Sequence, residues 1–128
     1  MLVEAYEDVP QSALDKQRLV QILVNLIGNA AQAMESMPAP ARQLTLGIAL
    51  VHGVRGARMR ITVQDTGEGI APENLARIFS HGFTTRASGH GFGLHSSAVA
   101  ATEMGGNLMV HSDGPGRGAT FTIEMPLP

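Results

Sequence analysis

The first third of the chain has apolar residues at steps of three and four, a spacing typical of an amphipathic α-helix. The apolar positions are Leu19, Ile22, Leu23, Leu26, Ile27, Ala30 and Met34. They predict a helix from about residue 16 to 36, with Asp15 as its N-cap and residues 36–40 as its end. Residues 2–6, ahead of Pro10, are expected to form a short edge strand.

The rest of the chain alternates between strand-like and helix-like runs. Paired strand-like runs with short, glycine-containing connections predict β-hairpins, and two helical runs lie between the pairs. The predicted elements are strands at 43–52 and 57–64, helices at 72–79 and 93–104, and strands at 107–112 and 119–125. Because antiparallel hairpins alternate with helices, we expect an α+β fold, a two-layer sandwich whose helices cover one face of a mixed, mostly antiparallel sheet.

Length and composition narrow the class of protein. The chain has 128 residues, which predicts one domain, and 44% of them are hydrophobic, enough for a real core. The net charge of −2 gives no electrostatic case for binding nucleic acid. There is no apolar run near 18 residues and no signal-peptide pattern, so no direct membrane contact is expected. The absence of cysteine fits a reducing compartment, and we expect a cytoplasmic location.

The lysine content excludes two kinds of nucleotide site. Lys16 is the only lysine, and it lies at a helix start far from any glycine cluster. A Walker A loop needs a lysine directly after its glycines, and a eukaryote-type protein kinase needs a strand lysine on the phosphates. If this chain binds a nucleotide, it therefore uses another kind of site.

An acidic, glycine-containing stretch follows the second predicted hairpin strand. It reads Asp65-Thr66-Gly67-Glu68-Gly69-Ile70 and precedes a Pro-Glu helix start. Gly67 and Gly69 would let the backbone approach a flat ligand or adopt positive φ. The Asp65 side chain could accept a hydrogen bond from an exocyclic amine. Taken alone, the pattern fits a plain turn equally well.

Two further features favour a phosphorylated ligand. Asn25 and Asn29 lie on one face of the first helix, either as solvated residues or with a side-chain oxygen available to Mg²⁺. Gly89, Gly91 and Gly93 alternate with other residues where a polar, aperiodic stretch opens a helix. Free backbone N–H groups and the positive end of the helix dipole would meet there, which indicates a phosphate site, and a flexible hinge fits the same pattern.

Four motifs occur in a fixed order along the chain. They are residues 25–30 (Asn-Leu-Ile-Gly-Asn-Ala), 65–69 (Asp-Thr-Gly-Glu-Gly), 78–86 (Ile-Phe-Ser-His-Gly-Phe-Thr-Thr-Arg) and 89–94 (Gly-His-Gly-Phe-Gly-Leu). They resemble the N, G1, F and G2 boxes of the catalytic ATP-binding domain of bacterial sensor histidine kinases, in the GHKL ATPase and kinase superfamily. Residues 118–121 (Gly-Ala-Thr-Phe) resemble the last box of this family. The resemblance covers roughly residues 12 to 125 and implies one catalytic domain over residues 1–128.

For the base end of the site, the resemblance implies that Asp65 accepts the adenine amino group. Gly67, Gly69 and Ile70 would shape the pocket around it. Thr120 would lie at the adenine edge, in contact with the base directly or through water.

For the phosphate end, the resemblance implies that Asn29 holds Mg²⁺ on the triphosphate, with Asn25 one turn earlier near the phosphates. Residues 80–92 would be the ATP lid, and Arg86 would contact the γ-phosphate. His90 would either touch phosphate or be solvated. The remaining lid and helix-start positions of the implied ATP site are Phe83, Gly89, Gly91, Gly93 and Leu94.

The resemblance also implies a reaction. A histidine protein kinase of this kind transfers the γ-phosphate of ATP to a histidine on a helical dimerisation domain, which this chain is expected to lack. That domain, on the same or a sister chain, and a downstream response regulator would be its partners, and the parent protein could be membrane-anchored. None of the five histidines lies in a helical His-Glu pattern like that of the phosphoacceptor. The isolated chain is therefore expected to bind ATP without phosphorylating itself.

Related folds leave alternatives. The gyrase, Hsp90 and MutL ATPases have a water-activating glutamate one turn before the metal-binding asparagine. Here that position is Asn25, which cannot act as a base at neutral pH, so hydrolysis is disfavoured. An anti-sigma-type serine protein kinase and a nucleotide-free interaction module of the same fold remain as alternatives.

Overall fold

The structure is a computed structural model, and it describes residues 2–6, 16–54, 56–79 and 93–126. Along the chain, the elements are β1 (Leu2–Tyr6), α1 (Lys16–Ala33), a short 3-10 helix η1 (Ala39–Ala41), β2 (Leu44–Gly53), β3 (Gly56–Asp65), α2 (Pro72–Leu75), α3 (Leu94–Glu103), β4 (Asn107–His111) and β5 (Ala119–Pro126).

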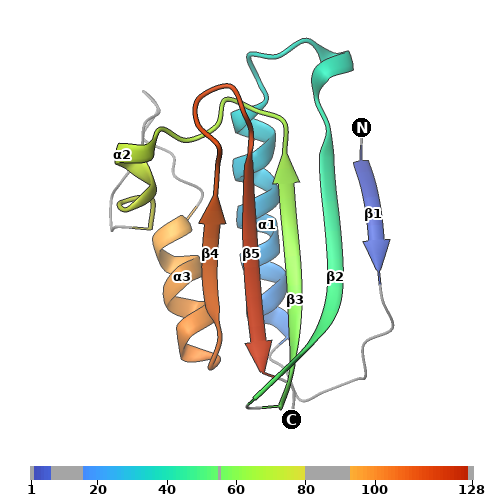
Figure 1. Ribbon diagram of the computed structural model, residues 1–128, viewed down its shortest axis with the longest axis vertical. Helices are drawn as coiled ribbons and strands as arrows, with labels where there is room; N and C mark the ends of the chain where they lie inside the picture. Colours follow the sequence, from blue (N-terminus) through green and yellow to red (C-terminus); the bar gives the residue numbers. More distant parts are fainter. Residues whose placement is uncertain (1, 7–15, 55, 80–92, 127–128) are drawn as a thin grey trace.

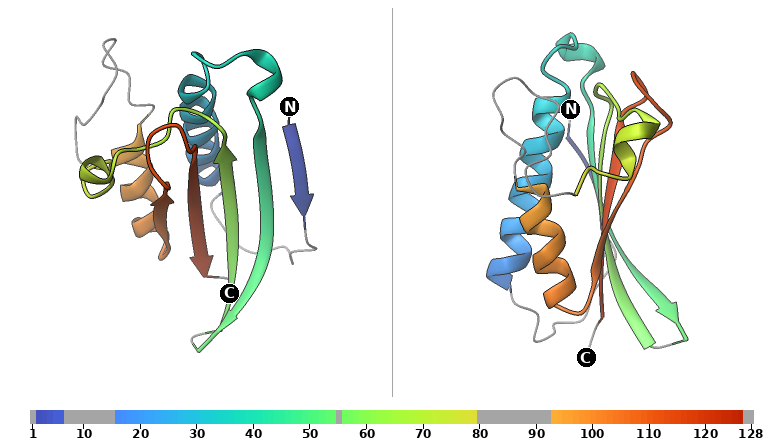
Figure 2. Two further views of the ribbon diagram at one scale, coloured as in Figure 1. Left: turned by 45° about the horizontal axis from the view of Figure 1, so that its top comes forward. Right: turned by 90° about the vertical axis from the view of Figure 1, so that its left-hand side faces the viewer.

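The five strands form one sheet in the order β1-β2-β3-β5-β4 (Figure 1). β1 pairs with β2 in parallel, and the other three pairs are antiparallel. The edge-on view in Figure 2 shows α1 and α3 together on one side of the sheet. The predicted α+β sandwich with a mixed, mostly antiparallel sheet is confirmed. Within the described residues, no helix has the length and apolar character needed to cross a membrane.

The core lies between α1, α3 and the helix-facing side of the sheet. Side chains on β3 and β5 alternate between buried positions and half-buried or exposed ones, as expected for strands with one covered face. Together with the apolar stripe of α1, the buried positions are Ile22, Leu26, Ala30, Met59, Ile61, Val63, Phe121, Ile123 and Met125. Phe121 is fully buried and pairs across the strands with Val63, so the centre of the core lies at the carboxyl-terminal half of β3.

Helix α1 ends earlier than the periodicity predicts, at Ala33 rather than near residue 36. The carbonyl of Ala33 accepts a hydrogen bond from the backbone N–H of Glu68, at 2.9 Å. After Ala33, backbone N–H groups bond to the carbonyl three residues earlier and no longer four. The Met37 N–H, for example, donates to the Met34 carbonyl at 3.0 Å. The helix therefore stops where the loop after β3 takes over one of its terminal carbonyl groups.

The predicted helix at 72–79 is also shorter, since α2 covers only Pro72–Leu75. The backbone beyond α2 is held by tertiary contacts. The ring of Phe79 packs edge-on against Phe121, with ring centroids 6.2 Å apart, and the Phe79 carbonyl lies 2.9 Å from His95 Nδ1 of α3. Because a carbonyl only accepts, His95 Nδ1 is the donor.

Candidate functional site

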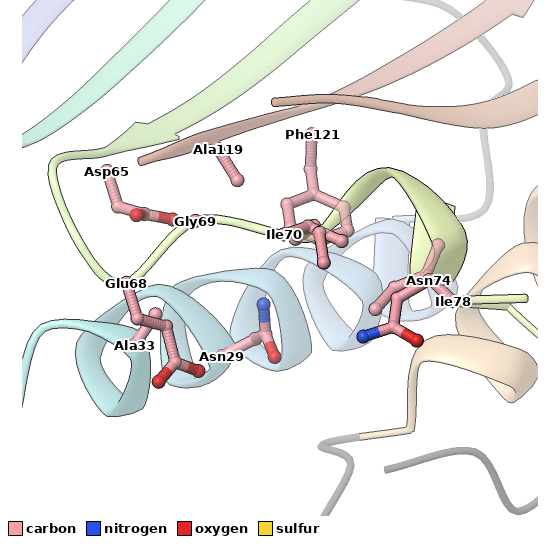
Figure 3. A pocket seen from close by; sticks show the side chains of 11 residues that line it. Asn29, Ala33, Asp65, Glu68, Gly69, Ile70, Asn74, Ile78, Ala119 and Phe121 are labelled. Carbon is pink, nitrogen blue, oxygen red and sulfur yellow. The ribbon is translucent and has the colours of Figure 1, made fainter. Parts of the chain in front are cut away.

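A cavity of about 270 Å³ lies between α1, the loop after β3, α2 and the start of β5 (Figure 3). It is lined by Asn29, Ala33, Asp65, Glu68, Gly69, Ile70, Ala71, Asn74, Ile78, Ala119 and Phe121. Three stretches of the chain meet here. Four of the predicted site residues line the same space: Asn29, Asp65, Gly69 and Ile70.

Asp65 is the last residue of β3 and is only 3% exposed. Its neighbours across the sheet are Leu44 and Ala119, the first residues of β2 and β5. Asp65 therefore lies at the edge of the sheet where β3 ends and these two strands begin. Oδ1 accepts a hydrogen bond from the backbone N–H of Gly67, at 2.8 Å. This bond holds the carboxylate in a tight turn at the edge of the cavity.

The two glycines of this loop both lie close to backbone of other segments, and Gly69 has the positive φ that the sequence analysis allowed for. A Cβ on Gly67 would lie 2.5 Å from the carbonyl oxygen of Ala33, and a Cβ on Gly69 would lie 2.1 Å from the carbonyl oxygen of Gly114. Both therefore allow close approach of protein backbone. Gly69, at φ +72°, lines the cavity. Gly67 does not line it and packs against Ala33 of α1.

Asn29 comes from the opposite wall, on the face of α1 that looks toward the sheet. It is 7% exposed, and its amide has no hydrogen-bond partner among the residues that the structure describes. Figure 3 shows the amide pointing into the cavity. The residue as a whole is buried, but its amide is open to the cavity, where a ligand can reach it.

Asn25, one turn earlier on α1, does not line the cavity. Its Nδ2 donates to Ser97 Oγ of α3 at 3.0 Å, and its Oδ1 accepts from Gln21 Nε2 at 3.2 Å. The bond to Ser97 and an ion pair between Arg18 and Glu103 connect α1 to α3, whereas the bond from Gln21 lies within α1. In this conformation Asn25 therefore links the two helices beside the cavity.

Thr120, which the sequence analysis placed at the adenine edge, does not line the cavity. Buried and half-buried positions alternate along β5, and Ala119 and Phe121 are the residues of this strand that line the cavity. Thr120 therefore points to the other face of the sheet, between Gln64 and His111 on the neighbouring strands. Ala119 takes the place that the sequence motif had suggested for Thr120.

Asn74, Glu68 and Ala33 are cavity residues that the sequence analysis missed. Asn74 lies across the cavity from Ala33 in Figure 3. A signal for Asn74 exists in the sequence, because in the helix predicted over 72–79 it precedes Ile78 by four residues and would share a face with it.

Of the predicted phosphate loop, the structure describes only its end. Gly93 has φ +63° and is the N-cap of α3, whereas the side chain of Leu94 is buried in the core and only its backbone can reach a ligand. The predicted site residues Phe83, Arg86, Gly89, His90 and Gly91 lie outside the described residues.

The charge of the cavity limits what it can bind. Its lining contains the carboxyl groups of Asp65 and Glu68 and, within the described residues, no lysine or arginine. The described residues also include no group of three or more His, Asp or Glu side chains that could hold a metal by themselves. A phosphorylated ligand would therefore need a metal ion that it brings itself, or cationic residues from outside this lining.

The model of the histidine kinase-, DNA gyrase B- and HSP90-like ATPase family matches residues 14–128. The chain belongs to this family. It is 36% identical over 123 residues to the sensor histidine kinase ZraS of Escherichia coli K12, covering 96% of this chain and 24% of that protein. It is 32% identical over 120 residues to the C4-dicarboxylate transport sensor protein DctS of Rhodobacter capsulatus, covering 94% of this chain and 18% of that protein. The chain thus spans about a quarter or less of these relatives.

Solved structures of this family have the same fold. The catalytic domain of the histidine kinase ThkA, in a nucleotide-free form, aligns with a TM-score of 0.76 at 24% identity and covers 98% of this chain and 79% of that one. Full-length ShkA in complex with AMPPNP aligns with a TM-score of 0.73 at 32% identity, covering 98% of this chain and 26% of that chain.

We predict that Gly67→Ala lowers the free energy of unfolding by about 1–3 kcal/mol, because its Cβ would collide with the rigid carbonyl of Ala33. Gly53→Ala is the matched control, since a Cβ there would meet nothing closer than 3.9 Å. Urea denaturation of both variants measures the difference. If Gly67→Ala were as stable as the control, the close contact between this loop and α1 would be contradicted.

Proposed function

We propose that this chain is the ATP-binding catalytic domain of a sensor histidine kinase, acting as a single domain. It binds ATP with Mg²⁺ and donates the γ-phosphate to a histidine on a helical dimerisation domain of the same or a sister chain. The observation that carries this proposal is the amide of Asn29, a residue only 7% exposed, which has no hydrogen-bond partner among the described residues and points into the cavity that Asp65 also lines. Because the amide is open to the cavity, its oxygen and its N–H groups can bind a ligand there.

Asp65 forms the base end of the proposed site. Its carboxyl group is buried, oriented by the N–H of Gly67 and surrounded by the apolar side chains of Ile70 and Ala119. A carboxylate only accepts hydrogen bonds, so it would select a base that presents an exocyclic amine, as adenine does. The adenine nucleotide analogue AMPPNP in the ShkA complex supports this assignment.

Asn29 forms the phosphate end. Its side-chain oxygen can ligate Mg²⁺, which takes oxygen ligands, keeps several waters and is commonly held by substrate phosphates. The metal would neutralise the charge of the triphosphate, which the carboxyl groups of the described lining cannot do. Gly93 at the start of α3 and residues 80–92, including Arg86, are proposed to complete this end.

The proposed chemistry is phosphoryl transfer by positioning and charge neutralisation. Asn25 stands where a related ATPase has its water-activating glutamate, and here its amide is bonded to Ser97 and Gln21. An amide has no basicity at neutral pH, so it would not activate a water molecule for hydrolysis. The phosphoryl group would instead pass to the helical domain and then to a response regulator. Because ZraS and DctS are named as sensor proteins, we place this reaction in bacterial signal transduction.

We predict that Asp65→Asn weakens ATP binding by about tenfold to a hundredfold, because a hydrogen bond to a charged group contributes about 1.5–3 kcal/mol. Asparagine can still accept the Gly67 N–H, so the fold should be retained. Isothermal titration calorimetry measures the affinity, and Glu73→Gln, an exposed carboxylate outside the cavity lining, is the control for charge. Binding by the Asp65 variant at wild-type strength would refute the base assignment.

Asn29→Ala is expected to remove the dependence of ATP binding on Mg²⁺. In the wild-type chain, affinity should fall when EDTA replaces Mg²⁺, because the metal bridges Asn29 and the phosphates. The variant should bind ATP with similar, weak affinity in both conditions. If Mg²⁺ strengthens binding equally in both proteins, Asn29 is not a metal ligand.

The isolated chain should not label itself when incubated with Mg²⁺ and ATP carrying a radioactive γ-phosphate. It contains no helical His-Glu phosphoacceptor pattern. Labelling is measured after electrophoresis under alkaline conditions, which preserve phosphohistidine. Stable, stoichiometric self-phosphorylation would show that an acceptor lies within these residues and that the proposed division of labour is wrong.

A further inference from the structure

Ser112 follows β4 and is 9% exposed, and it does not line the cavity. Its hydroxyl accepts hydrogen bonds from the backbone N–H groups of Ile70, at 3.0 Å, and Gly114, at 3.2 Å. It donates to the carbonyl oxygen of Gly118, at 2.7 Å. One donor and two acceptors are all that a hydroxyl offers, so this side chain is fully used in holding backbone together.

These bonds continue to the proposed base-binding carboxylate. Ser112 holds the Gly118 carbonyl, the Gly118 N–H donates to the Gly67 carbonyl at 3.2 Å, and the Gly67 N–H donates to Asp65 Oδ1 at 2.8 Å. A parallel bond from the Gly116 N–H to the Glu68 carbonyl, at 2.7 Å, ties the same two segments. Ser112 is therefore connected to Asp65 through two glycines that are 51 positions apart in the sequence (118 − 67).

The two segments are also in direct backbone contact. A Cβ on Gly118 would lie 2.2 Å from the Asp65 carbonyl oxygen, and a Cβ on Gly69 would lie 2.1 Å from that of Gly114. Such close approach leaves no room for the loop after β3 to move independently of the 113–118 turn. A change in the position of the turn must therefore move Asp65 or Ile70 in the cavity wall.

We propose that Ser112 is a positioning residue for recognition of the nucleotide base. It orients the Asp65 carboxylate through Gly118 and Gly67, and it holds Ile70 at the cavity by its direct bond to the Ile70 N–H. Ser112 can have this role only if the ligand is the adenine nucleotide of the proposed function. Since it acts on the base end alone, it should affect discrimination between bases and leave contacts to the phosphates unchanged.

The test compares ATP with purine riboside triphosphate, which has the same ribose and phosphates and lacks the 6-amino group. The wild-type chain should bind ATP more tightly by about tenfold to a hundredfold, as expected for one hydrogen bond to a carboxylate. Ser112→Ala should reduce this ratio to about threefold or less, because Asp65 is no longer held toward the amine. A general loss of stability would weaken both nucleotides alike and would not change the ratio.

Two further variants and a control make the result decisive. Ser112→Thr keeps the hydroxyl and should retain the wild-type ratio of the two affinities. Ser112→Cys fills the same space with a weak donor and should lower the ratio. It serves as the test if Ser112→Ala does not fold. Thr102→Ala removes an exposed hydroxyl that donates to the Ala98 carbonyl at 3.0 Å in α3, and it should leave the ratio at the wild-type value.

The outcomes separate two failures. If the wild-type chain does not distinguish the two nucleotides, Asp65 does not bind the amine, and both the base assignment and the role of Ser112 are refuted. If the wild-type chain distinguishes them and Ser112→Ala or Ser112→Cys does so equally well, only the role of Ser112 is refuted.

Discussion

The cavity depends on one backbone contact, between the carboxyl end of α1 and the loop after β3. The Ala33 carbonyl accepts the Glu68 N–H, and Gly67 lies so close to that carbonyl that no side chain fits between them. This contact lies where the helix ends and fixes the loop after β3 against α1, on the side of the cavity where Asn29 faces Asp65. Because it uses a carbonyl that the helix cannot satisfy internally, it contributes to the stability of the helix and to the shape of the site at once.

The two ends of the cavity are built in different ways. Asp65 is held from behind by a chain of backbone hydrogen bonds that ends at Ser112, so its orientation is a property of the folded sheet and its turn. Asn29 is held only by its place on a packed helix, and its amide remains available. A rigid acceptor at one end and a free amide at the other suit a ligand with a flat, amine-bearing base and a charged, metal-bound tail.

Much of the fold followed from the sequence, because periodicity reports burial directly. The order of strands and helices and the layers they form were predicted from apolar spacing, and Asp65 and Asn29 were singled out by residue type and position. Element ends were less accurate. The first helix ends at Ala33 and α2 ends at Leu75 because contacts with Glu68, Phe121 and His95 replace further helical turns. Such contacts join residues far apart in the chain and leave no local pattern.

The sequence alone therefore determined which segments become strands and helices and which residue types could meet a nucleotide, since both depend on local spacing and side-chain chemistry. The tertiary structure decided which of those residues share a cavity. The alternation of side chains along β5 directs Ala119 toward the cavity and Thr120 to the other face of the sheet. The packing of α1 against α3 brings Asn25 into a hydrogen bond with Ser97. The sequence of the acidic, glycine-containing loop is also compatible with a plain turn. In the structure the backbone of this loop lies between Ala33 and the 113–118 turn. Only packing between distant segments makes it a wall of the cavity.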